Sequence, residues 1–496
     1  MQRVFLKKEP NLLAKHEAFP FQAEASQAIR DLDYAAVFHE QGLGKTKIAI
    51  DVVLYWLEKK LIDAVLVVVK KALLANWQRE LALHTHIKPR LLSQDRRANF
   101  FVFNSPARVI LAHYEVIQSE RERMALFLKT RSVAAVLDES AKIKNPGSSI
   151  TRTFFELAPL FAKRLILTGT PVANRPYDIW SQVWFLDQGA SLGNDFAQFK
   201  RDVDMTSSLS NDPQAQEQFE NSVQGIFRRI RHFSVRERKS SGLIELPQKI
   251  VTRVRAEWEH YQFDLYRQIR DDLRAVVVKD GIPSEDKSEE FLKRLMRLVQ
   301  VASNPRLVDD SYNAEPGKLP PVKDLVRSIC ERGEKCIIWT SFTENADCLA
   351  QEFRPSGARR VHGKLPLEQR NRSIERFLTD PECKVLIATP GAAKEGLTLT
   401  VANHVIFYDR SFSLDDYLQA QDRIHRISQT KTCFVYNIIM AGSIDEWVDV
   451  LLHAKQLAAQ LAQGDISHDY YRSQMSYDFA EVLGDVLGIS HTGGNG

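Results

Sequence analysis

Cysteine, net charge and long hydrophobic runs are all scarce in this sequence, and each scarcity narrows the possible classes of protein. Only five cysteines occur among 496 residues, and they are scattered without the paired spacing of zinc ligands. An odd number of scattered cysteines predicts a reduced, cytoplasmic protein with neither a disulfide framework nor a zinc site. No apolar stretch approaches the length of a membrane helix, and the N-terminal residues lack a signal-peptide pattern, so we expect no membrane association.

The overall charge does not indicate a binding partner. The formal net charge is only +4, so a surface that binds nucleic acid would have to be a local basic cluster. The apolar fraction of 44% and the charged fraction of 26% are typical of a soluble globular protein. The length suffices for roughly three domain-sized units.

The most informative stretch is HEQGLGKT, residues 39–46. It ends in Gly-Lys-Thr and leads into the apolar, periodic run 47–54, which predicts the start of a helix. Such a loop binds phosphates because small residues let backbone N–H groups approach them and the helix dipole favours negative charge. Lys45 would contact the β- and γ-phosphates, and the Thr46 hydroxyl would hold Mg²⁺. His39 replaces the first glycine of the full pattern, and a turn that merely caps a helix is the alternative.

Predicted strands alternate with predicted helices around this loop. The β-branched run 64–69 suits a strand buried on both faces of a parallel sheet, and 73–81 predicts a helix, so we expect an α/β layered domain. The strand 132–139 ends in the carboxylates Asp138 and Glu139, at the strand end where ligand sites of open α/β sheets lie. A Mg²⁺-nucleotide site needs one carboxylate for the metal and one to deprotonate water. A solvated Asp-Glu pair is the alternative.

From about residue 189 to 310 the strand pattern stops, and the sequence indicates charged, interrupted helices. The densest basic cluster of the chain lies here and is opposed only by Glu237. Such a cluster is suited to contacts with the phosphate backbone of nucleic acid. The alternative, and the more common case for a run of charges, is a solvent-exposed helix face. The basic cluster consists of Arg228, Arg229, Arg231, Arg236, Arg238 and Lys239.

The segment 310–321, rich in Pro, Gly and Asn, is the predicted linker.

A second α/β region begins near residue 322, with predicted strands at 336–340 and 384–389. Further along, Arg423 and Arg426 are three residues apart in a predicted helix and would share one face of it. They are suited to be arginine fingers that stabilise charge on a transferring phosphate. Exposed arginines paired with carboxylates such as Asp422 are the alternative.

Several of these stretches resemble the motifs of superfamily-two helicases, specifically the Swi/Snf-type double-stranded DNA translocases. HEQGLGKT, LDESAKIKN and LTGTPVANRPYDIW resemble motifs I, II and III, and KKALLANWQREL resembles motif Ia. GAAKEGL and QAQDRIHRISQ resemble motifs V and VI, and the helix that ends near Gln463 resembles the family's brace helix. Departures from the family pattern occur at Lys70, Ser140-Ala141, Ala393-Lys394 and Ser428.

The resemblance implies an α/β fold with two tandem RecA-like parallel-sheet domains and a helical insertion region between them. The expected divisions are an ATP-binding domain at 1–188, a helical region at 189–310, a second RecA-like domain with the brace helix at 322–463, and a tail at 464–496.

The resemblance also implies a DNA-dependent ATP hydrolase that uses ATP and Mg²⁺. Glu139 would be the base, Thr46 and Asp138 would hold the metal, and Gln22 could read an adenine edge. The first domain would contribute Gln22, Gly42, Gly44, Lys45, Thr46, Asp138 and Glu139, and the second Gly396, Gln419, Arg423 and Arg426. Nucleic-acid contacts are expected from Lys394, Thr170, Arg228 and Arg229.

The expected function is translocation on double-stranded DNA that remodels protein–DNA or branched-DNA complexes. A separate nuclease, repair, transcription or defence factor would be its partner. Two alternatives stay open at this point: a strand-separating DNA or RNA helicase, and an ATP-switched DNA clamp.

Overall fold

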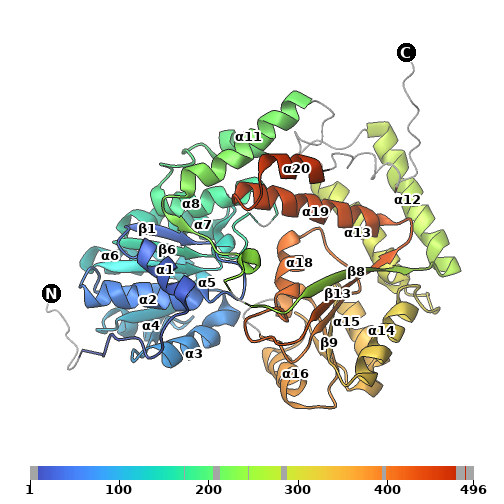
Figure 1. Ribbon diagram of the computed structural model, residues 1–496, viewed down its shortest axis with the longest axis horizontal. Coiled ribbons are helices and arrows are strands. Elements are labelled where there is room, and N and C mark those ends of the chain that lie inside the picture. Colours follow the sequence, from blue (N-terminus) through green and yellow to red (C-terminus); the bar gives the residue numbers. More distant parts are fainter. Residues whose placement is uncertain are drawn as a thin grey trace. The chain divides into compact units, whose positions relative to one another are not determined.

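The computed structural model describes residues 9–172, 174–204, 213–243, 245–280, 288–393, 398–475 and 486. The chain divides into two compact units, each an α/β layered structure (Figure 1). The first unit comprises residues 1–245 and 458–471, and the second comprises 246–457 and 472–496.

The first unit is built on a seven-stranded sheet in which every pair of neighbouring strands is parallel. The strand order is β3-β4-β2-β5-β6-β1-β7. The strands are β1 (Tyr34–Val37), β2 (Ala64–Val69), β3 (Arg90–Leu91), β4 (Val109–His113), β5 (Val133–Asp138), β6 (Lys163–Leu167) and β7 (Ser234–Val235). The larger helices are α1 (Pro20–Ile29), α2 (Lys45–Glu58), α3 (Leu74–His84), α4 (Arg96–Phe103), α5 (Tyr114–Ser119), α6 (Arg121–Thr130), α7 (Ser149–Leu157), α8 (Trp180–Asp187), α9 (Phe196–Val203) and α11 (Pro213–Ile230).

The core of the first unit follows from the two-residue period of its strands. Alternate residues of β2, such as Val65, Val67 and Val69, pack with Ile48 and Val52 of α2 in one hydrophobic cluster. The intervening residues of β2 are equally buried, because helices cover both faces of the sheet (Figure 1). The continuous apolar run 64–69 therefore correctly predicted a strand buried on both faces.

The second unit contains a six-stranded, all-parallel sheet in the order β10-β11-β9-β12-β13-β8. Its strands are β8 (Lys249–Ala256), β9 (Cys336–Trp339), β10 (Arg359–Val361), β11 (Val385–Ala388), β12 (His404–Phe407) and β13 (Cys433–Met440). Its helices include α12 (His260–Asp280), α13 (Ser288–Ser303), α14 (Leu319–Glu331), α15 (Thr343–Glu352), α16 (Leu367–Thr379), α17 (Pro390–Ala393) and α18 (Leu414–Gln421). The expected fold class, two tandem parallel-sheet α/β domains, is confirmed.

Strand β8 was not predicted, because the region 189–310 was expected to consist of charged, interrupted helices without strands. It pairs with β13 along its full length and forms an edge of the second sheet. Most of its side chains are exposed, and Arg253 and Arg255 interrupt its apolar pattern. Charged side chains are common on edge strands because they oppose edge-to-edge aggregation, and here they conceal the strand signal. The division of the chain into functional domains by residue number stays a prediction.

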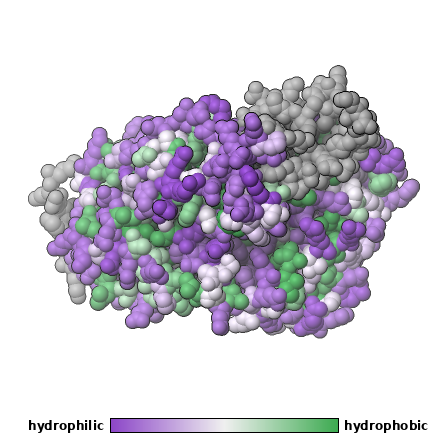
Figure 2. Space-filling model, turned by 45° about the horizontal axis from the view of Figure 1, so that its top comes forward, coloured by the Kyte–Doolittle hydropathy of each residue, from purple (hydrophilic) through white to green (hydrophobic). Residues whose placement is uncertain are grey.

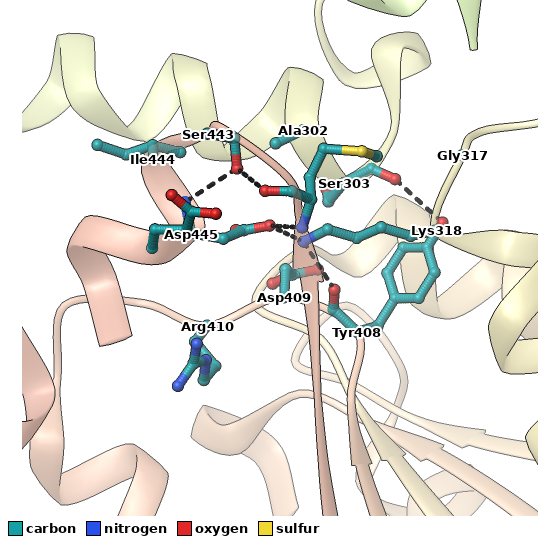
Figure 3. A network of polar contacts seen from close by, with 12 residues as sticks. Ala302, Ser303, Gly317, Lys318, Tyr408, Asp409, Arg410, Ser443, Ile444 and Asp445 are labelled. Carbon is teal, nitrogen blue, oxygen red and sulfur yellow. Dashed lines mark hydrogen bonds and ion pairs between the residues drawn. The ribbon is translucent and has the colours of Figure 1, made fainter. Parts of the chain in front are cut away.

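The segment 310–321, predicted as a linker, lies within the second unit and is anchored there by buried side chains. The Lys318 side chain is fully buried, and its ammonium lies 2.6 Å from a carboxylate oxygen of Asp445. It also donates a hydrogen bond of 3.1 Å to the Tyr408 carbonyl, and the Tyr408 hydroxyl donates to the Ser303 carbonyl (Figure 3). The linker prediction is therefore wrong, because proline and glycine mark where a chain turns, not whether the turn is packed.

Asp409 lies in the same polar network, one residue beyond Tyr408 (Figure 3). Its carboxylate accepts hydrogen bonds from the Ser341 backbone N–H, at 2.6 Å, and from the Thr340 hydroxyl. Burial raises the pKa of Asp409, and these hydrogen bonds oppose that rise. The network thus holds the loop after β9 against the end of β12.

Helix α19 (Ile444–Ala462) begins in the second unit, and its last residues belong to the first. The short helix α20 (His468–Gln474) follows it. His468 pairs with the buried Glu220 of α11 at 2.8 Å, which fastens this C-terminal segment to the first unit.

The visible surface is mostly hydrophilic, with small, separate hydrophobic patches (Figure 2). Within the described part of the chain, no helix is both long and apolar enough to cross a membrane.

Candidate active site

The phosphate loop of the first unit lies between β1 and α2, as the sequence predicted. Helix α2 begins at Lys45, and Gly44 precedes it with a left-handed φ of 75°. Gly42 also has a positive φ, of 87°. Both positions require the conformational freedom of glycine, so the loop can expose its backbone N–H groups at the positive end of the helix dipole. Thr46 follows in the first turn of α2 and is half-buried.

Gln22 lies directly against this loop. Its side-chain amide donates a 3.2 Å hydrogen bond to the Leu43 carbonyl, and its carbonyl accepts one from the Phe19 N–H at 3.1 Å. A Cβ atom on Gly44 would lie 2.1 Å from the amide nitrogen of Gln22, so glycine is required for this approach. The structure thus brings Gln22 to the phosphate loop, and its contact with adenine stays a prediction.

The Lys45 side chain is folded back onto its own loop. Its ammonium donates to the carbonyls of His39, at 2.9 Å, and Glu40, at 3.3 Å, and to the side-chain oxygen of Gln41, at 3.4 Å. Its positive charge also acts on Asp138, whose pKa it lowers against the effect of burial. The structure thus places Lys45 within its loop, and its contact with phosphates stays a prediction.

Asp138 and Glu139 stand at the C-terminal end of β5, as expected. Burial, and then the charge of Glu139, raise the pKa of Asp138 to about 6. Glu139 has a left-handed φ of 53°, which costs a residue with a side chain about 1 kcal/mol. Its Oε2 atom is buried without a hydrogen-bond partner among the described residues. A strained backbone and an unsatisfied buried oxygen are both costs that indicate a functional position.

Gln41 joins these groups, and sequence reasoning missed it. Its side-chain amide donates to Glu139 Oε1 at 3.0 Å, while its oxygen accepts from Lys45. A Cβ atom on Gly169 would lie 2.9 Å from the Gln41 side chain, so the 168–170 turn packs closely against it. No sequence signal could have found Gln41, because the phosphate-loop pattern accepts any residue at its position.

Thr170, predicted to contact nucleic acid, is only 7% exposed in this turn. Its backbone N–H donates to the Thr168 hydroxyl at 3.2 Å. The structure therefore places Thr170 beside the nucleotide site, and its contact with nucleic acid stays a prediction.

Trp77 is a second residue that sequence reasoning missed. The indole N–H of this α3 residue donates a 2.7 Å hydrogen bond to Asp138 Oδ2, and the Glu139 backbone N–H donates to Oδ1. The bond from Trp77 lowers the pKa of Asp138 and so opposes the effect of burial. Trp77 lies in the stretch that resembles motif Ia, but the spacing of an apolar helix indicates only burial.

Ser140, one of the departures from the family pattern, also has a defined role in the structure. Its hydroxyl donates to the side-chain oxygen of Gln182 at 2.7 Å. The amide of Gln182 in turn donates to the Pro171 carbonyl at 3.0 Å. The segments that resemble motifs II and III are therefore joined by buried hydrogen bonds.

In the second unit, Arg423 and Arg426 do not share a helix face, so that prediction is wrong. Helix α18 ends at Gln421, and both arginines lie in the following turn. Arg423 is 2% exposed and donates to the Gln419 carbonyl at 3.1 Å, while Arg426 is half-buried and donates to the Asp422 carbonyl at 2.9 Å. Gln419 itself donates to Asp415 at 2.8 Å.

The reason for the turn lies further along the chain. The Gln429 side chain donates to the carbonyls of Ala402 and Ile424, and so binds the turn to the core in place of helical hydrogen bonds. Gln419, Arg423 and Arg426 are thus brought together within the second unit, and their action on a nucleotide stays a prediction.

For the remaining expected site residues, the structure shows less about their surroundings. Lys394 and Gly396 lie outside the described residues. Arg228 and Arg229 are exposed in the last turn of α11, a position where the helix dipole also favours cations. Their nucleic-acid contacts stay a prediction, whereas Arg236 of the same basic cluster is committed to contacts within the protein.

The first-unit site suits ATP and Mg²⁺. Gly42 and Gly44 give the loop its left-handed turns, and Lys45 places a positive charge at the start of the following helix. Asp138 and Thr46 offer the hard oxygen ligands that Mg²⁺ prefers. The unsatisfied Oε2 atom of Glu139 is suited to accept a proton from water.

The fold and this site define the class of protein: a helicase-like, ATP-hydrolysing enzyme. The chain belongs to the SNF2-related family, because the sequence model of the SNF2-related domain matches residues 35–307. The helicase conserved C-terminal domain matches residues 318–428. The resemblance drawn from the motifs is thereby confirmed, as is the expectation of an ATP-using enzyme.

Individual relatives are considerably longer than this chain. It is 28% identical over 438 residues to the uncharacterized ATP-dependent helicase MG018 of Mycoplasma genitalium, covering 87% of this chain and 40% of that protein. It is 28% identical over 434 residues to the ISWI chromatin-remodeling complex ATPase ISW1 of Saccharomyces cerevisiae, covering 82% of this chain and 37% of that protein. The chain thus spans less than half the length of these curated relatives.

Among solved structures, the chain is similar to the Sulfolobus solfataricus SWI2/SNF2 ATPase core in complex with dsDNA. The identity is 25% and the TM-score is 0.43, with 98% of this chain and 100% of that chain covered.

Proposed function

We propose that this chain is an ATP-driven motor that translocates along double-stranded DNA. It would remodel protein–DNA or branched-DNA complexes together with a separate nuclease, repair, transcription or defence factor. One observation carries the proposal: Gln41 joins Lys45, Glu139 and the 168–170 turn in a single buried cluster. The residues for phosphate binding and hydrolysis are thus in contact with the segment that resembles motif III.

The family supports the choice of substrate. The motifs of this chain resemble those of the Swi/Snf-type translocases throughout, and the relative ISW1 is named as the ATPase of a chromatin-remodeling complex. Double-stranded DNA is therefore the proposed track, with Lys394, Thr170, Arg228 and Arg229 among its contacts.

Each residue of the site has a proposed role in hydrolysis. Lys45 exchanges its loop carbonyls for the β- and γ-phosphates, because a charge-assisted hydrogen bond to phosphate is stronger than one to a neutral carbonyl. Glu139 orients the attacking water and accepts its proton, while Gln41 holds the other oxygen of the carboxylate. When bound by Asp138 and Thr46, Mg²⁺ neutralises phosphate charge. Arg423 and Arg426 of the second unit stabilise charge on the γ-phosphate, and Gln419 positions Arg423 through its carbonyl.

The test is ATP turnover by the full chain with duplex DNA, single-stranded DNA or RNA, followed by displacement of a triplex-forming strand. We expect duplex DNA to stimulate turnover most, and the third strand to be displaced without separation of the duplex. Best stimulation by single strands or RNA, with unwinding, would instead indicate a strand-separating helicase. Duplex-stimulated turnover without displacement of the third strand would indicate an ATP-switched clamp. Glu139→Gln is the control in each assay, because it should bind ATP without turnover.

A further inference from the structure

Arg236, from the predicted basic cluster, contacts the entrance of the phosphate loop. Its guanidinium donates a 2.7 Å hydrogen bond to the carbonyl of Phe38, the residue directly before His39. The same guanidinium forms a two-pronged contact with Asp465, with 2.7 Å between Arg236 Nε and Asp465 Oδ1. The two side chains are only 13% and 6% exposed. Arg236 therefore links Asp465 to the backbone at the entrance of the phosphate loop.

The residues around Arg236 run beside the phosphate loop, and we call residues 235–239 the loop support. The Phe38 N–H donates to the Val235 carbonyl at 2.8 Å, and the Glu40 N–H donates to the Glu237 carbonyl at 3.0 Å. The Lys239 N–H donates to the Glu40 carboxylate at 2.8 Å. The position of the loop support therefore affects the first residues of the phosphate loop directly.

Asp465 reaches the loop support from the far end of the chain. It lies three residues beyond the end of α19, and its N–H donates to the Gln460 carbonyl of that helix at 2.8 Å. The Asp465 carbonyl also accepts from Arg238 at 2.7 Å. Since α19 begins in the second unit and ends in the first, Asp465 connects a helix of both units to the loop support.

We propose that Asp465 and Arg236 are positioning residues of the ATPase. Asp465 fixes the guanidinium of Arg236, which fixes the Phe38 carbonyl and with it the entrance of the phosphate loop. Loss of this contact frees the entrance of the phosphate loop, and so lowers the affinity of the loop for nucleotide. The proposal rests on the proposed function of the same site.

Asp465→Asn in the full chain is the test. The variant keeps the shape of the side chain but removes the charge and one acceptor for the guanidinium. Because a hydrogen bond to a charged group contributes a factor of about ten or more, we expect the Kd for a non-hydrolysable ATP analogue and the KM for ATP to rise about tenfold. The affinity for duplex DNA should change less than about twofold, since no DNA contact is assigned to Asp465.

Glu220→Gln is the matched control. It weakens the pair between Glu220 and His468, which fastens the same C-terminal segment to α11 rather than to the loop support. We expect it to lower the Tm without changing the Kd for the analogue. If both variants lower the Tm alike and neither changes the Kd, Asp465 has only a structural role and the proposal is wrong.

The double variant Arg236→Gln/Asp465→Asn tests whether the two residues act on the phosphate loop through the same contact. Because both residues act through one contact, it should bind the analogue no more weakly than the weaker single variant. If the losses of analogue affinity in the two single variants add up fully in the double variant, the residues do not act through one contact. Absence of analogue binding by the unmodified chain would instead refute the proposed function, which distinguishes the two failures.

Discussion

His39 should make the stability of the first unit depend on pH. It occupies the first-glycine position of the phosphate loop and is only 2% exposed, with its ring stacked beside Phe21 at 6.2 Å. Burial, and then the positive charge of Lys45, lower the pKa of His39 from 6.5 to about 4. The imidazole is therefore neutral in the folded protein at neutral pH.

The sign and size of the effect follow from the two pKa values. Between pH 6.5 and pH 4 the unfolded chain binds a proton at His39 and the folded chain does not. Stability that is present at pH 7 is thus lost as the pH falls through this range. Linkage gives a loss of about 2 kcal/mol between pH 7 and pH 5 for this residue alone.

Comparison with His39→Gln isolates this contribution, because glutamine does not titrate. Urea unfolding at pH 7 and pH 5 would give the free energy of unfolding of both proteins. Proteolytic cleavage of the first unit is the readout for its unfolding. We expect the unmodified protein to lose about 2 kcal/mol more than the variant between these pH values. Equal losses would show that His39 titrates normally, and would refute its assignment as a neutral, buried group.

Three further predictions, made on four substitutions, test the active site and the core of the second unit. Glu139→Gln should lower phosphate release by at least about 100-fold while analogue binding persists, and turnover near the unmodified rate would exclude Glu139 as the base. Arg423→Ala and Arg426→Ala should each lower turnover on the order of 1000-fold with little change in analogue affinity, whereas unchanged rates in both would exclude arginine fingers. Lys318→Met should cost about 3 to 5 kcal/mol in urea unfolding, because it leaves a buried carboxylate unpaired; an equal loss in the surface control Lys323→Met would contradict this reason.

Local patterns were enough to predict much of the first unit. The run 64–69 matches β2 residue for residue, and Lys45 begins a helix as its glycine-rich loop required. Asp138 and Glu139 stand at a strand end, where continuous apolar residues followed by carboxylates placed them. These features were predictable because strand burial, helix starts and phosphate loops depend on neighbouring residues.

The contacts that complete the site could not be predicted in this way. Gln41 binds a residue 98 positions away, and Trp77 binds one 61 positions away. Neither position carries a local pattern, since a loop residue and an apolar helix residue fit many roles. The turn that holds Arg423 likewise depends on Gln429 and the core behind it.

The sequence by itself was enough to identify the family and the two parallel-sheet units, and it predicted the residues that would bind ATP. The tertiary structure decided which neighbours hold those residues, that Lys318 is buried rather than in a linker, and that Asp465 reaches the loop support. Short motifs specify the groups that chemistry needs, whereas the neighbours that hold them depend on burial and packing between distant segments.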